Sequence, residues 1–211
     1  MVPVSHMPEG TGTSEGDNNI GLCFFSDDGG GTWKRSRMPA KLDDGRGMAE
    51  PCVAGVGDRV LMLARTGSGH LFSSWSDDGG DTWSKPEATT LESACSSLTL
   101  KTLPDGRLIV FYNHVTPIKP SAFFPRTPLC YAVSGDSGKT WSPPVIVDDE
   151  GVANKDRQNI YPSACFTKEG MVVMWSTHSA DPKGSFDGQY DANIGGGKRA
   201  ILKLPANPPK T

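Results

Sequence analysis

One eight-residue pattern, Ser-x-Asp-x-Gly-x-x-Trp, occurs three times in this sequence and constrains the fold more than any other feature. The three copies start at Ser26, Ser76 and Ser134, so they are spaced by 50 and 58 residues. Three matches to four fixed positions do not arise by chance in a chain of 211 residues. A period of about 20–50 residues or slightly more is typical of solenoids, propellers and other repeat folds.

Each copy of the pattern follows a strand-like run, at residues 22–25, 71–75 and 129–133, and ends in Trp before polar residues or Pro. We therefore predict a hairpin turn between antiparallel strands. In such a turn Asp accepts backbone N–H groups, Gly takes a positive φ, and Trp folds back and buries a large apolar surface. These roles are structural, and we assign them to Ser26, Asp28, Gly30, Trp33, Ser76, Asp78, Gly80, Trp83, Ser134, Asp136, Gly138 and Trp141.

The segments between the boxes also repeat. Each unit is predicted to contain a strand, a tight turn, a strand, a loop, a strand, the box and a last strand. The three inner hairpins are expected at residues 50–64, 97–113 and 161–177. Four antiparallel strands in about 50 residues make a propeller blade. The 25 Gly and 17 Pro residues agree with a turn-rich, all-β fold and argue against a helix bundle.

Composition narrows the function classes. The formal net charge is −3 and Lys and Arg are scattered, so nucleic acid is not an expected partner. The longest apolar runs hold about five residues, far short of the ~20 that a membrane span needs. Residues 1–19 contain no apolar signal core, so the sequence leaves the compartment open: cytoplasmic if the chain is complete, secreted or periplasmic if it is truncated. The five cysteines lack CxxC spacing and are expected to be buried free thiols. We expect no cofactor and no metal.

The boxes and their spacing resemble the Asp-box, or BNR, repeats of the sialidase (neuraminidase) superfamily. The resemblance covers about residues 19–204. It implies a partial β-propeller of about three to four four-stranded blades, similar to the C-terminal half of a six-bladed sialidase domain. The active site would lie at the central axis, on the face opposite the boxes. We assign residues 1–18 to a flexible N-terminal tail, 19–204 to the propeller and 205–211 to a C-terminal tail.

The family's order of functional residues has matches in this sequence. The Glu that opens an inner strand is matched by Glu50, in Met-Ala-Glu-Pro-Cys-Val, and the Arg that ends the next strand by Arg65. The Arg before the strand that enters the next box is matched by Arg126. The Tyr that opens the last inner strand is matched by Tyr161. The resemblance implies that Tyr161 is a nucleophile, Glu50 its base, and the two arginines a clamp for the substrate carboxylate.

Sialic acid carries a carboxylate on its anomeric carbon, and arginines bind carboxylates through paired hydrogen bonds. An anionic nucleophile would be repelled there, whereas a neutral Tyr is not, although its pKa near ~10 means that it needs a base. Asn113 and His114 end a strand at the level of Arg65, and we assign them to substrate binding.

Each assignment has a structural alternative. Glu50 can be a solvated strand residue, Arg65 can emerge at the rim, Arg126 can belong to a Pro-rich loop, and Tyr161 can be a packed aromatic with a satisfied hydroxyl. A lone His such as His114 is more often structural than functional. The site assignment rests on the ordered set rather than on any single residue.

Two departures from the family matter. The first family arginine, in a Phe/Tyr-Arg-Ile-Pro motif, and the aspartate acid/base that follows it have no match in this sequence. Two function classes therefore stay open: an exo-α-sialidase-like retaining glycosidase acting on sialic acid or a similar acidic sugar, and a non-catalytic glycan-binding propeller module or fragment. A different sugar-active propeller enzyme, such as a lyase or rhamnosidase, is a weaker third. We also expect self-association through open blade edges.

Overall fold

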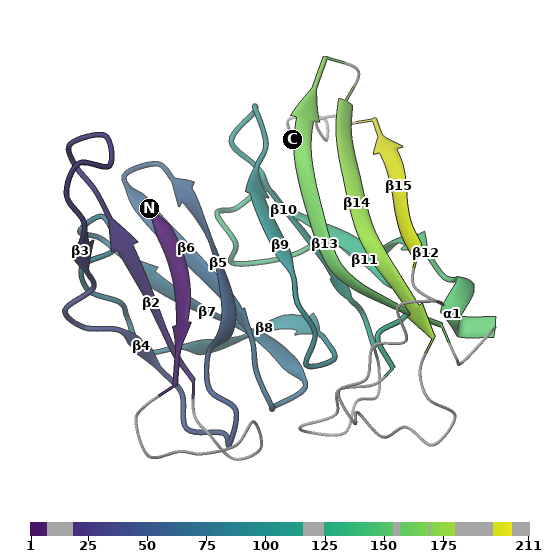
Figure 1. The fold of residues 1–211 in the computed structure, drawn as a ribbon, viewed down its shortest axis with the longest axis horizontal. Helices are drawn as coiled ribbons and strands as arrows, with labels where there is room; N and C mark the ends of the chain where they lie inside the picture. The colour runs from purple at the N-terminus through teal and green to yellow at the C-terminus, as the bar shows by residue number, and fades with distance from the viewer. Residues whose placement is uncertain (8–18, 116–124, 154–156, 169, 180–195, 204–211) are drawn as a thin grey trace.

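Four small antiparallel sheets stand side by side as blades of a β-propeller in the computed structural model (Figure 1). The model describes residues 1–7, 19–115, 125–153, 157–168, 170–179 and 196–203. Helix is limited, in this part of the chain, to the single turn α1 (Glu150–Ala153). None of the described helical segments is long and apolar enough to cross a membrane. The predicted all-β partial propeller is confirmed.

The first blade contains β1 (Val2–His6), β2 (Ile20–Phe25) and the two short outer strands β3 (Lys34–Arg35) and β4 (Ala40–Lys41). Assigning residues 1–18 to a flexible tail was wrong for β1, which pairs antiparallel with β2 over its whole length. A polar N-terminal stretch gives little sign of this pairing, because β1 is held by backbone hydrogen bonds to a distant strand. Residues 8–18 and the predicted C-terminal tail, 205–211, lie outside the described residues.

The second and third blades follow the predicted four-stranded unit, three strands of the fourth blade are described, and the strands of all three blades pair in chain order. The second blade comprises β5 (Ala49–Val56), β6 (Arg59–Arg65), β7 (His70–Ser76) and β8 (Glu87–Glu92). The third comprises β9 (Thr99–Thr102), β10 (Leu108–Asn113), β11 (Leu129–Ser134) and β12 (Val145–Asp148). The fourth comprises β13 (Arg157–Thr167), β14 (Gly170–Ser179) and β15 (Gly196–Leu202).

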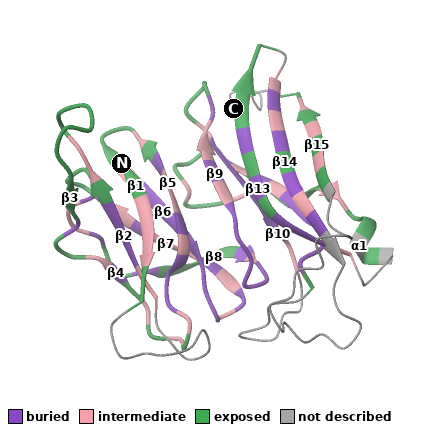
Figure 2. Cartoon of the chain, viewed as in Figure 1, coloured by how far each residue is buried: buried purple, intermediate pink, exposed green. Residues whose placement is uncertain are grey.

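The apolar core lies between the blades, as the buried middle strands in Figure 2 show. Every residue of β10 is buried, and so are residues 61–65 of β6. Both strands read as continuous apolar runs rather than alternating ones, because their two faces pack on different neighbouring sheets. Three clusters fill the interfaces, one for each pair of adjacent blades, with Met62, Leu98 and Phe111 among their members.

The cysteines follow this packing only in part. All five are free thiols, and Cys23, Cys95 and Cys130 are buried as expected. Cys52 is half-buried, and Cys165 is exposed. Cys165 lies on β13 between the buried Ala164 and the exposed Phe166, so its side chain is on the face of the last described sheet that points away from the third blade. Strand context alone does not tell which of two faces is covered.

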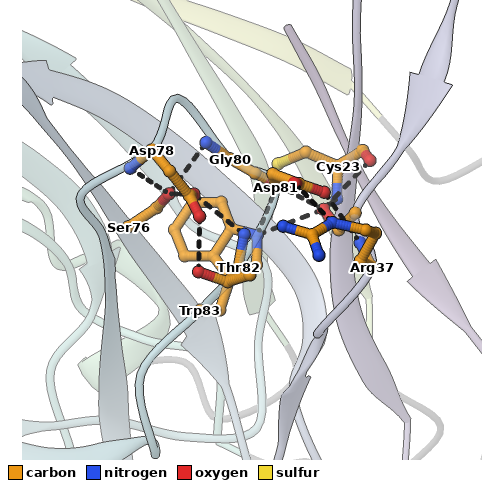
Figure 3. A network of polar contacts seen from close by, with 9 residues as sticks. Cys23, Arg37, Ser76, Asp78, Gly80, Asp81, Thr82 and Trp83 are labelled. Atoms are coloured by element: carbon orange, nitrogen blue, oxygen red, sulfur yellow. Dashed lines mark hydrogen bonds and ion pairs between the residues drawn. The ribbon is translucent and has the colours of Figure 1, made fainter.

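Each box is a hairpin turn closed by the same hydrogen bonds, shown for the second box in Figure 3. The Ser76 hydroxyl donates to Asp78 Oδ1 and accepts the Gly80 N–H. Asp78 in turn accepts the N–H and the hydroxyl of Thr82. The fixed glycine has a positive φ of 98°, 99° and 82° in the three boxes, a conformation that a side chain would oppose. The network is therefore local and repeats with the sequence.

The boxes lie at the end of each sheet opposite the start of its inner strand. β5 and β7 are both antiparallel to β6, so they run in the same direction. The second box follows the C-terminal end of β7, whereas Glu50 is the second residue of β5. The box hairpin and Glu50 are thus separated by the length of the sheet.

The box of the second blade also joins that blade to the first. Trp83 is 6% exposed and packs in the cluster between the two blades. Its Nε1 donates to the hydroxyl of Ser36, at 3.2 Å. The backbone N–H of Arg37 donates to the carbonyl of Asp81, at 2.8 Å, and Figure 3 shows Arg37 beside Asp81 of this box. Trp33 differs from the prediction, because it is 50% exposed. The box Trp is buried by the neighbouring blade rather than by its own hairpin, and the described residues contain no blade on that side of the first one.

This difference predicts unequal effects of two matched substitutions. Trp83→Ala removes a buried aromatic side chain and should lower the free energy of unfolding by about 3–5 kcal/mol. Trp33→Ala, at the same position of an equivalent hairpin, should cost less than about 1 kcal/mol because half of the side chain is already in water. Chemical denaturation of both variants measures this. Equal losses would show that the box Trp stabilises its own hairpin.

A second prediction concerns acid. The hydroxyl and the backbone N–H of Thr82 stabilise the Asp78 carboxylate and lower its pKa from 3.8 to about 2. Because this folded-state pKa lies below the unfolded one, the stabilisation is complete above about pH 4 and is lost as the pH falls through about 2. Asp78→Asn should lower the melting temperature by about 2–4 °C near pH 6 and by almost nothing near pH 2. Asp58→Asn, in the β5–β6 turn, is the control, and a difference that persists at low pH would contradict the prediction.

Candidate functional site

Two inner strands carry the same unusual backbone at the positions that sequence analysis selected. Glu50 and Tyr161 have φ values of +44° and +52°. Each lies in a bulge, where the register shifts between Ala49 and Cys52 on β5 and between Ile160 and Ser163 on β13. A residue other than Gly in this region costs about 1–3 kcal/mol, and such strain is concentrated at functional sites.

A proline follows each of these residues. Pro51 and Pro162 have no N–H, so the unpaired position of the bulge leaves no backbone donor without an acceptor there. The Glu-Pro and Tyr-Pro pairs therefore fit their bulges chemically. Tyr161 is 47% exposed, whereas Ile160 and Pro162 on either side are buried, so the burial pattern of β13 still alternates at this position.

Arg65 ends β6 opposite the start of β5 and pairs with Glu50. Its Nη2 lies 2.8 Å from Glu50 Oε1, and its Nη1 donates to the carbonyl of Cys95 at 3.1 Å. Arg65 is only 9% exposed. Within the described residues, its Nε and Glu50 Oε2 are buried and have no hydrogen-bond partner. One donor and one acceptor of this ion pair are thus left unsatisfied.

Arg126 lies close to this pair and is 3% exposed. Burial lowers the pKa of its guanidinium, and the charge of Arg65 lowers it further, while Tyr161, Cys95 and Glu50 act in the opposite direction. Two buried guanidinium groups that repel each other favour an anion between them or beside them. The structure therefore brings Glu50, Arg65, Arg126 and Tyr161 into one neighbourhood, from the second blade, the fourth blade and the segment before β11.

Asn113 does not have the substrate-binding position that we predicted. It is completely buried, and its Nδ2 donates to the carbonyls of Arg126, at 2.8 Å, and Asn159, at 3.1 Å. Its Oδ1 accepts the hydroxyl of Ser96. Asn113 links the Arg126 segment to the start of β13 by hydrogen bonds. It therefore holds site residues in place without lining the cavity itself. Asn113 does end a strand, as predicted, but the sequence did not show that its side chain points into the protein rather than toward the cavity.

His114 is half-buried, and its described contacts are with Tyr112 and Ser93. Its ring lies edge-on to that of Tyr112, with 6.0 Å between the centroids, and its backbone forms a bridge with Ser93. His114 does not line the cavity described next. These contacts are structural and do not support the predicted role in substrate binding.

A cavity of about 510 Å³ runs along the inner strands. It is lined by residues of all four blades, namely Pro3, Ser5, Glu50, Pro51, Cys52, Ser97, Leu98, Tyr161, Pro162 and Ser163. Glu50 and Tyr161 therefore face one space, and Arg65 reaches its edge through the ion pair with Glu50. Among the described residues, no group of three or more His, Cys, Asp or Glu side chains is arranged to hold a metal ion.

Sequence reasoning missed two serines of this cavity. Ser5 and Ser97 hydrogen-bond to the backbone N–H groups of Glu50 and Tyr161, at 2.8 and 2.9 Å. Ser97 had a detectable signal, because the repeat places it at the position that Glu50 and Tyr161 occupy in their own blades. Ser5 had none, since it lies in a segment that was taken for a tail.

Comparison with known proteins agrees with this geometry. The family model described as a BNR repeat-like domain matches residues 1–174. No curated protein matches the sequence.

Among solved structures, a Dyadobacter fermentans protein of unknown function has a TM-score of 0.59 and 22% identity, covering 88% of this chain and 47% of that one. The NanB sialidase of Streptococcus pneumoniae has a TM-score of 0.60 and 17% identity over 91% of this chain and 28% of that one. Trypanosoma rangeli sialidase has a TM-score of 0.58 and 18% identity over 78% and 26%.

At these identities the solved structures establish a shared fold, and this chain spans less than half the length of each of them. The family match covers most of the chain and includes all three boxes. With its sialidase-like propeller blades and its repeated box hairpins, the chain belongs to the BNR repeat-like family.

Proposed function

We propose that this chain carries the nucleophile, the base and two carboxylate-binding arginines of a retaining, exo-α-sialidase-like glycosidase. The observation that supports this best is the shared cavity of Glu50 and Tyr161, with Arg65 bound to Glu50 and the buried Arg126 beside them. The substrate would be a glycoside of sialic acid or a similar acidic sugar. Two buried guanidinium groups recognise its carboxylate through paired hydrogen bonds, and a guanidinium is more weakly hydrated than an ammonium group.

The proposed chemistry uses the polar atoms that the fold leaves unpaired. Arg65 Nε donates to the substrate carboxylate, and Glu50 Oε2 accepts the phenolic proton of Tyr161. The phenolic oxygen then forms a bond to the anomeric carbon while the bond from that carbon to the leaving oxygen breaks. Water later displaces Tyr161 and restores the sugar's original configuration. The carboxylate of the substrate does not repel a nucleophile that is neutral before attack.

The leaving oxygen needs a proton from an acid that this set of residues does not include. The aspartate that supplies it in sialidases has no match in this sequence. General acid catalysis contributes about 10²–10⁴-fold in rate. We therefore expect the chain by itself to cleave ordinary sialosides slowly or not at all, although the nucleophile and base can still act on a substrate whose leaving group needs no proton.

A fluorinated sialic acid tests nucleophilic attack by Tyr161 separately from protonation of the leaving group. Trypanosoma rangeli sialidase, a fold neighbour, has been crystallised with 2,3-difluorosialic acid as a covalent intermediate. Fluoride leaves without protonation, so the proposal predicts that this probe labels Tyr161 of the present chain, as peptide mass spectrometry would detect. Tyr161→Phe should abolish labelling, and Glu50→Gln should slow it by about 10²-fold or more. Tyr131→Phe, in the third blade and outside the cavity, is the matched control. Absence of label on the wild type contradicts a hydrolase site.

The carboxylate clamp is tested by binding. Arg65→Lys keeps the charge but loses the planar pair of donors, so the Kd for a sialic acid analogue should rise by about 10-fold or more. Arg59→Lys, at the other end of β6, should leave the Kd unchanged. An effect of similar size for a neutral sugar would argue against carboxylate recognition. Binding without labelling would instead favour a glycan-binding module.

Self-association through blade edges stays a prediction.

A further inference from the structure

The backbone of the two strained residues is held by hydroxyl groups from neighbouring inner segments. A bulge removes one N–H from the ladder of a sheet, and a buried N–H without an acceptor is costly. The N–H of Tyr161 donates to Ser97 Oγ at 2.9 Å, and Ser97 lies in the third blade, just before β9. The N–H of Glu50 donates to Ser5 Oγ at 2.8 Å, and Ser5 lies on β1 of the first blade. The same bond therefore occurs at both bulges, supplied each time by the preceding blade.

Ser97 has a special place in the repeat. Cys52, Thr99 and Ser163 pair with equivalent residues of the second strands, and Glu50, Ser97 and Tyr161 each lie two positions before them. Ser97 is the residue of the third blade at this position, so it stands between Glu50 and Tyr161 around the axis and lines their cavity. Its own φ is not positive, unlike theirs. The small side chain leaves room for the hydroxyl to reach the backbone of the next blade.

A second contact from the same segment fixes the other side of the Tyr161–Pro162 unit. The hydroxyl of Thr99 donates to the carbonyl of Pro162. At the equivalent place between the second and third blades, the thiol of Cys52 donates to the carbonyl of Leu98 at 3.2 Å. The third blade thus binds the N–H of Tyr161 and the carbonyl of the following residue, Pro162, so the Tyr161–Pro162 unit is held at both ends.

We propose that Ser97 and Ser5 are positioning residues that keep Tyr161 and Glu50 in their left-handed bulge conformations and so set the direction of both side chains. Without the hydroxyl acceptor, the bulge loses the bond that offsets its strain and can relax toward ordinary extended backbone. The side chain then turns relative to its partner across the cavity. The link to catalysis rests on the proposed function, whereas the effect on the backbone does not.

The test measures the two effects separately. Amide exchange of Tyr161, followed by NMR in a chain labelled with ¹⁵N-Tyr, should be about 10-fold faster in Ser97→Ala, because one hydrogen bond is lost. Ser97→Thr keeps a hydroxyl and should restore slow exchange. Ser73→Ala is the control, since it removes a serine hydroxyl that contacts the carbonyl of Glu87 at the outer edge of the second blade. In the same variants, the rate of Tyr161 labelling by 2,3-difluorosialic acid should fall about 10-fold or more in Ser97→Ala, with little change in the affinity for a sialic acid analogue.

Unchanged exchange and unchanged chemical shift of Tyr161 in folded Ser97→Ala overturn the proposal. If this variant does not fold, Ser97→Cys, which is close in size and a weak acceptor, takes its place. Ser5→Ala supplies an independent measurement through the Glu50 amide in a chain labelled with ¹⁵N-Glu. Failure of the wild type to react with the fluorinated sugar counts against the proposed function alone, because the exchange rates still decide whether the serines hold the bulges. Faster exchange with an unchanged labelling rate removes the link to catalysis and overturns the positioning role.

Discussion

Neighbouring sheets are held together by the apolar side chains of their middle strands, and the other features of the molecule depend on this contact. β6 and β10 are buried on both faces, so each belongs to two interfaces at once. A single four-stranded sheet cannot bury both of its faces alone, and stacking neighbours supplies the missing cover. The position of every side chain at the axis is therefore set by how one blade packs on the next, because adjacent inner strands contribute to one cavity.

The boxes and the starts of the inner strands lie at opposite ends of the sheets and have different roles. At the box end, short local hydrogen bonds close each hairpin, and Trp83 and Arg37 connect the second blade to the first. At the other end, bulges expose Glu50 and Tyr161, and hydroxyl groups of the preceding blade satisfy the N–H groups that the bulges release. Strain is thus located where the chemistry is proposed, and it is offset by contacts between blades rather than within a blade.

The charges of the candidate site follow from the same arrangement. Arg65 is oriented by Glu50 and the carbonyl of Cys95, and the Arg126 segment is anchored through Asn113 and Asn159. Both guanidinium groups are largely buried. Burial screens their mutual repulsion less than water would, and it also strengthens their attraction for an incoming carboxylate. This arrangement suits the planar carboxylate that we propose as the ligand.

Several of these features were determined by the sequence itself. The fold class and an approximate number of blades, about three to four, follow from the spacing of the boxes and from the turns between them. These are local signals, because the Ser, Asp, Gly and Trp of one box act within eight residues. The set of Glu50, Arg65, Arg126 and Tyr161 could be selected because its order along the chain is a property of the sequence, although its function stays a proposal.

Only the tertiary structure decided the rest, because it depends on contacts between residues far apart in the chain. The pairing of β1 with β2, the exposure of Trp33 and the burial of Asn113 are all set by what lies opposite in space. The same is true of Ser5 and Ser97, whose hydroxyl groups act on residues 45 and 64 positions away. Periodicity tells which residues occupy equivalent positions, but only the packing of one blade on another decides which way each side chain points and what it binds.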